Sequence, residues 1–156
     1  MQKEDNNREI NFNRPSNSKN IIGQSIGEMN LWKKILAFLQ QEHLSQKNKL
    51  VEILRNNKEN AGDILEIAEG YQNKFLQQDE AFRLMWNDMV QFERSLGEIY
   101  GHRDKDIIQR RKKLRQELEI LDANFYELKT DFNKLFDFFF ADNYSETWLA
   151  QGGKRR

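Results

Sequence analysis

The sequence predicts an all-α fold: an elongated up-down-up antiparallel three-helix bundle with coiled-coil-like packing, with self-association as a further way to complete its core. Its 156 residues include only 1 Pro and 8 Gly, too few turn-forming residues for an all-β domain. Aromatic residues make up 12% of the chain and include 11 Phe, which argues against a mostly disordered chain. Three long stretches repeat apolar residues at alternating steps of three and four, the spacing of packed helices.

The first element predicted is a polar arm followed by a helix. Residues 1–24 are Asn-rich, have no apolar period and contain the only proline, which indicates a disordered or loosely attached arm. A helix is predicted over residues 25–58, because Ser25 followed by Glu28 matches a capping box. Its core-spaced positions are Met29, Trp32, Leu36, Leu39, His43, Gln46, Leu50 and Ile53.

Two further helices are predicted over residues 62–100 and 103–141, after short Asn- and Gly-containing turns. The second seam comprises Ile64, Ala68, Tyr71, Phe75, Gln78, Phe82, Met85, Met89, Phe92, Leu96 and Ile99. The third comprises Ile107, Arg111, Leu114, Leu118, Leu121, Phe125, Leu128, Phe132, Leu135 and Phe139. Short turns make neighbouring helices antiparallel, so the bundle spans residues 25–141 and leaves a C-terminal tail with a basic end, 142–156.

Three polar residues interrupt the apolar seams of the first two helices: His43 and Gln46 in the first and Gln78 in the second. With a turn near residue 60, antiparallel pairing places His43 level with residues 77–78. Buried polar groups need partners, and a satisfied polar layer fixes the register of packed helices. We therefore expect a polar core layer with a structural role; a ligand-binding or pH-sensing site is the alternative, since histidine titrates near pH 6.5.

Several aromatic residues near the end of the third helix lie off the main apolar seam. They widen the core, receive the tail or form an oligomer contact, and exposed apolar clusters mark interaction sites. The candidate partner surface consists of Phe136, Phe138, Phe140 and Trp148.

The start of the third helix carries the densest run of positive charge. The candidate basic patch consists of Arg110, Lys112, Lys113 and Arg115. Nucleic-acid-binding domains are usually strongly basic, whereas this chain has no net charge and a pI near 6.8. A solvated helix face with pairs such as Lys113–Glu117 is the simpler interpretation, and Arg111 is expected to pair with Glu28 or Glu93.

The small number of Cys and His residues and the lack of catalytic motifs predict no catalytic residue, no metal site and no cofactor. The chain has no Cys and only 2 His, and it contains no Glu-x-x-His pair of the kind that di-iron bundles use. Neither a Gly-x-Ser-x-Gly motif nor a glycine-rich phosphate loop occurs.

The N-terminal residues lack the apolar region of a secretory signal. Apolar runs such as residues 138–141 fall far short of the roughly 20 residues of a membrane-spanning helix. We therefore expect a cytoplasmic protein without membrane contact. The predicted function is a non-catalytic protein-protein interaction or assembly module whose partner is another protein or a second copy. Alternatives are a nucleic-acid or ribonucleoprotein accessory factor using the basic start of the third helix, and a ligand-binding bundle around His43 and Gln78.

Overall fold

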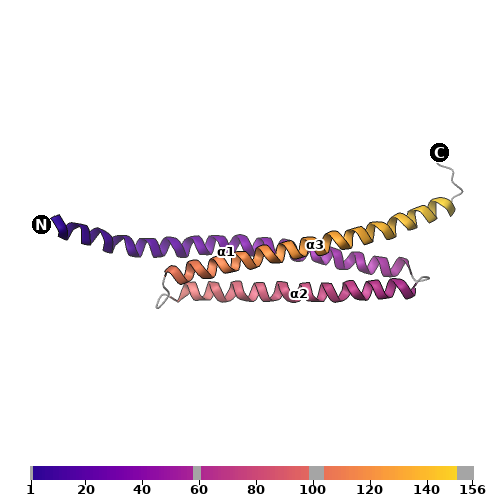
Figure 1. Ribbon diagram of the computed structural model, residues 1–156, viewed down its shortest axis with the longest axis horizontal. Helices are drawn as coiled ribbons and strands as arrows, with labels where there is room; N and C mark the ends of the chain where they lie inside the picture. Colours follow the sequence, from indigo (N-terminus) through magenta and orange to yellow (C-terminus); the bar gives the residue numbers. More distant parts are fainter. Residues whose placement is uncertain (1, 58–60, 99–103, 151–156) are drawn as a thin grey trace. The chain divides into compact units, whose positions relative to one another are not determined.

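The computed structural model describes residues 2–57, 61–98 and 104–150, and the side chains of residues 20–57, 62–98 and 104–139. It contains the helices α1 (Gln2–Asn56), α2 (Ala61–Gly97) and α3 (Asp104–Ala150) (Figure 1). The helices pack pairwise and the described residues include no strand, so the predicted all-α three-helix bundle is confirmed. Within these segments, no helix has the long apolar stretch that a membrane span requires.

The chain divides into two compact units, each built from a segment of all three helices. Unit 1 comprises Met1–Ala37 and Phe82–Ile120, and unit 2 comprises Phe38–Ala81 and Leu121–Arg156. Six large side chains of the predicted second and third seams are buried, as their spacing predicts: Phe75, Phe82, Phe92, Leu118, Phe125 and Phe132.

Unit 1 has a core of large apolar side chains from all three helices. Ion pairs flank this core, because Lys33 of α1 pairs with Glu93 of α2, while Glu28 of α1 pairs with Arg115 of α3 at 2.8 Å. The two flanks of α1 therefore carry opposite charge, basic toward α2 and acidic toward α3. The buried apolar residues of this unit include Met29, Trp32, Leu36, Phe82, Met85, Met89, Phe92, Leu114 and Leu118.

The core of unit 2 contains several contacts between aromatic rings. The rings of Phe75 in α2 and Phe132 in α3 meet edge to face with centroids 5.1 Å apart, a favourable geometry for aromatic pairs. Leu50, Ile53, Ile64 and Ala68 pack in the same cluster.

Ion pairs also join α1 to both of its neighbours in unit 2. Lys47 pairs with Asp79 of α2, and Glu42 pairs with Lys129 of α3. The residue numbers rise together from Glu42–Lys129 to the hydrogen bond between Lys49 and Asn133, so α1 and α3 run parallel here.

The helices at both ends of the chain are longer than the sequence predicted. Helix α1 begins at Gln2 rather than near Ser25, so it includes residues 2–24, and α3 continues to Ala150 through most of the predicted tail. The predicted capping box is wrong, because Ser25 is buried inside α1 and its hydroxyl donates a hydrogen bond to the Ile21 carbonyl at 2.7 Å. Once a packed seam has nucleated a helix, each added residue gains a hydrogen bond, so the helix extends without an apolar face of its own.

Candidate functional site

His43 of α1 lies at the centre of a polar site inside unit 2. Its side chain is buried, and its ring meets the rings of Phe75 and Phe125 edge to face, with centroids 5.2 Å and 5.8 Å away. His43 Nε2 lies 3.1 Å from the Phe75 carbonyl oxygen and 3.2 Å from an Asp79 carboxylate oxygen. Both of these oxygens are acceptors, so Nε2 carries a hydrogen and donates it to them.

Asp79 links this buried imidazole to the surface. One carboxylate oxygen faces His43, and the other accepts a hydrogen bond from Lys47 on the neighbouring turn of α1. The His43 side chain is about 2% exposed, whereas that of Asp79 is 40% exposed. A single carboxylate therefore connects the interior of unit 2 to its solvent face.

Burial lowers the pKa of His43 below its ordinary value, because the interior disfavours the charged imidazolium. The Asp79 carboxylate and the Phe75 carbonyl oppose this shift, and the positive charge of Lys47 adds to it. The net direction favours a neutral His43 in the folded protein at neutral pH.

Two buried amide groups accompany His43 in this unit. Gln46 of α1 and Gln78 of α2 are 2% and 8% exposed. Among the described residues, Gln46 Oε1 and Gln78 Nε2 have no hydrogen-bond partner. The predicted polar core layer is thus buried on both helices, and its role in fixing register stays a prediction.

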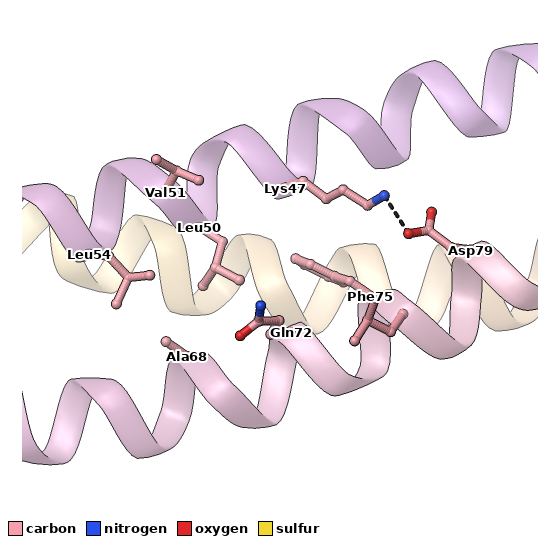
Figure 2. A pocket seen from close by; sticks show the side chains of 9 residues that line it. Lys47, Leu50, Val51, Leu54, Ala68, Gln72, Phe75 and Asp79 are labelled. Carbon is pink, nitrogen blue, oxygen red and sulfur yellow. Dashed lines mark hydrogen bonds and ion pairs between the residues drawn. The ribbon is translucent and has the colours of Figure 1, made fainter.

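A groove runs between α1 and α2 on the surface of unit 2. It has a volume of about 270 Å³ and is open to solvent, with Ala68 and Gln72 of α2 facing Val51 and Leu54 of α1. Figure 2 shows the Lys47–Asp79 pair at one end, with Leu54 and Ala68 toward the other. Ala68 has the smallest side chain among the residues that line the groove.

Exposed apolar side chains surround this groove. Val51 is 44% exposed, Leu54 is 37% exposed and Leu76 is 59% exposed. Single exposed apolar residues are ordinary, whereas exposed apolar residues gathered around a hollow form a candidate binding surface.

The candidate partner surface at the end of α3 is only partly within the described residues. Phe138 is 60% exposed and its ring meets that of Phe139, with centroids 5.9 Å apart. Phe136 is half-buried beneath the Lys49 ammonium, which lies 5.1 Å from the ring centroid. The side chains of Phe140 and Trp148 lie outside the described residues.

The candidate basic patch lies in unit 1, and much of its charge is engaged within the fold. Arg110 sits over the Phe92 ring at 5.4 Å, Arg115 forms a two-oxygen contact with Glu28, and Lys113 lies 3.8 Å from Glu117, as predicted. Lys112 is exposed.

The predicted partner of Arg111 is also confirmed, since its Nε lies 3.7 Å from Glu28. Arg111 additionally donates a hydrogen bond to the Ser25 hydroxyl at 3.3 Å.

Sequence reasoning missed the groove and the bridging role of Asp79. A signal for both existed, because Lys47 and Asp79 each lie one residue after a buried seam position and so flank the interface between α1 and α2. The groove itself depends on how the side chains of two helices are matched in space, and no sequence motif indicates that matching.

No protein-family model, curated protein or solved structure matches this chain. In the described part of the chain, no three His, Asp or Glu side chains gather as metal ligands.

Proposed function

We propose that this protein is a non-catalytic interaction or assembly module that accepts a segment of another polypeptide on unit 2. The observation that carries this proposal is the groove between α1 and α2, rimmed by the exposed side chains of Val51, Leu54 and Leu76. An amphipathic helix laid along such a groove buries its apolar face in the way that two packed helices do. The bundle then acts as a preformed docking surface.

The size of the groove favours a polypeptide over a small molecule. Small-molecule sites usually enclose roughly 300–1,000 Å³ and bury most of the ligand. This groove measures about 270 Å³ and is open along its length. It has room for a few side chains of a partner helix, whose backbone would remain outside.

A nucleic-acid role would use the basic start of α3, and the contacts there weigh against it. Arg115 and Lys113 lie beside carboxylates of the same chain, which offset part of their positive charge. Non-specific nucleic-acid affinity comes mainly from cations that neutralise phosphates. The paired patch is a weaker source of that affinity than its sequence indicates.

Site-specific photo-crosslinking of the full chain in native cell lysate tests the interaction role. A benzophenone side chain replaces Leu76 in the groove, Phe138 on the aromatic end of α3, or Tyr126, an exposed α3 residue used as the control. We expect discrete crosslinked polypeptides from position 76 that are missing from position 126. Identical product patterns from positions 76, 126 and 138, or no product from any of them, would contradict the proposal.

A further inference from the structure

The groove lies within a wider apolar face of unit 2 that both α1 and α2 form. Leu44 of α1 is exposed and lies seven residues before Val51, so the two side chains share one side of the helix. Leu65 of α2 is exposed and lies seven residues before Gln72, which lines the groove. The face therefore extends along two helices beyond the hollow itself.

Both ends of this face carry a cation on α1 and a carboxylate on α2. At one end, Lys47 and Asp79 line the groove and pair with each other (Figure 2). Toward the other end, Arg55 and Glu69 are exposed just outside the lining, each next in sequence to a lining residue. The positive charges thus belong to one helix and the negative charges to the other.

The antiparallel pairing of α1 and α2 also sets the levels of these charges along the groove. Lys47 and Asp79 are level, because they form an ion pair. Arg55 lies eight residues after Lys47, and Glu69 lies ten residues before Asp79. Residue numbers rise along one antiparallel helix as they fall along the other, so Arg55 and Glu69 are level to within one turn.

A second copy of the chain matches this pattern when α2 of each copy lies over α1 of the other. A two-fold axis parallel to the groove gives this arrangement, and it keeps every residue at its own level. Lys47 of one copy then faces Asp79 of the other, so the two internal ion pairs join into a ring of four alternating charges. Arg55 of each copy faces Glu69 of the other.

The same arrangement covers the apolar face. The exposed side chains of Val51, Leu54 and Leu76 from both copies converge between four helices, which is how four-helix bundles build their cores. The other symmetric arrangement, with α1 over α1 and α2 over α2, brings cations over cations and carboxylates over carboxylates. Like charges across an interface oppose association, so the charges select the first arrangement.

We propose, building on the interaction role above, that this face of unit 2 binds a second copy of the chain, with α2 of each copy over α1 of the other. The apolar side chains around the groove supply the buried centre of the contact. The charges at its two ends set which helix lies over which.

Sedimentation equilibrium of the full chain measures the dissociation constant of the dimer. Leu76→Ser should raise this constant about tenfold or more, because the change acts in both halves of a symmetric interface. Tyr126→Ser, which removes a still more exposed side chain on α3, should leave it unchanged. Far-UV circular dichroism checks that each variant is folded, and Val51→Ser replaces Leu76→Ser if the latter is not.

Charge reversal tests which helix lies over which. Arg55→Glu or Glu69→Arg alone puts like charges opposite each other at two places in the dimer and should raise its dissociation constant about tenfold. A mixed dimer of these two variants has opposite charges at both places. Fluorescently labelled Arg55→Glu should therefore bind unlabelled Glu69→Arg about tenfold more tightly than it binds itself.

A matched charge reversal on α3 is the control for this titration. Glu127 is exposed, and Glu127→Arg leaves Glu69 in place. Labelled Arg55→Glu should bind Glu127→Arg more weakly than it binds Glu69→Arg, because one of the two contacts still joins like charges. Equal binding of the two would overturn the proposed arrangement and with it the inference.

The outcomes separate this inference from the broader interaction role. A dimer that Leu76→Ser leaves intact would place the contact elsewhere and overturn the inference. A chain that stays monomeric at up to about 0.5 mM, with discrete crosslinks from position 76 to other polypeptides, would overturn the inference alone. A monomeric chain without crosslinks from position 76 would remove the interaction role as well.

Discussion

The interiors of the two units share one pattern of apolar spacing but treat their polar groups differently. In unit 1 the buried Ser25 hydroxyl donates to the Ile21 carbonyl and accepts from Arg111, which also contacts Glu28. In unit 2 the buried atoms Gln46 Oε1 and Gln78 Nε2 have no hydrogen-bond partner among the described residues. Buried polar groups that lack partners reduce stability. The comparison predicts that the buried polar side chains cost more stability in unit 2 than in unit 1.

In both units, charged side chains at the surface are engaged by contacts within the chain. The basic residues at the start of α3 in unit 1 are engaged with Glu28, Glu117 and the Phe92 ring. In unit 2, the two charged residues that line the groove, Lys47 and Asp79, are paired with each other.

The largest expected effect comes from truncating one core phenylalanine in each unit. Phe82→Ala in unit 1 should lower the free energy of unfolding by about 3–5 kcal/mol, because it leaves a cavity among apolar side chains. Phe125→Ala in unit 2 should cost less, because its ring borders His43 and the new space has polar groups that can hold water. Urea denaturation of the full chain measures both. Equal losses would remove the distinction between the two interiors.

Replacing the polar layer should reverse the usual effect of a core mutation. The joint change of His43 and Gln78 to Leu should leave stability unchanged or raise it, because an unpaired buried amide costs about 1–3 kcal/mol. Gln78→Leu alone should gain less, since it leaves the buried His43 beside a more apolar surface.

Ser25→Ala in unit 1 is the control, and it should lower stability by about 1 kcal/mol because Ser25 is paired. Thermal and urea unfolding of all variants check these signs. A double Leu variant that is strongly destabilised would show that the polar layer is satisfied in solution.

Lowering the pH should destabilise unit 2 through His43. The pKa of His43 is lowered in the folded protein, so below about pH 6.5 the unfolded chain binds a proton that the folded chain does not. Stability should therefore fall as the pH drops from about 6.5 toward the folded pKa, by at most about 1.4 kcal/mol per pH unit for this proton. His43→Gln should flatten this part of the profile of unfolding free energy against pH. An unchanged profile would show that His43 does not carry it.

The smallest expected effect concerns the basic segment of unit 1. Lys112→Glu combined with Lys113→Glu should change the free energy of unfolding by no more than about 0.5 kcal/mol, because both side chains are exposed. We also expect the parent protein to show no salt-dependent binding to non-specific RNA or DNA at about 50 mM salt. Such binding in the parent, lost in the double variant, would instead support the nucleic-acid role.

The core could be predicted from the sequence because it depends on a repeat. Steps of three and four put Phe75, Phe92 and Phe132 on the apolar face of their helices, and that face is buried whichever helix packs against it. The helix start could not be predicted, because Ser25 fits a cap and a buried back-bonded position equally well. The groove could not be predicted either, since it requires Ala68 to face the Val51 side of α1 across two helices.

The opposite charges on the two flanks of α1 have a consequence for topology. Apolar seams alone allow a third helix to pack on either side of a hairpin, giving two arrangements of opposite hand. In each unit the lysine flank of α1 meets carboxylates of α2, through Lys33 or Lys47, and the glutamate flank meets cations of α3, through Glu28 or Glu42. The arrangement of the other hand would separate all of these pairs. Each pair is weak at the surface, but all depend on the same choice, so together they favour one handedness of the fold over its mirror topology.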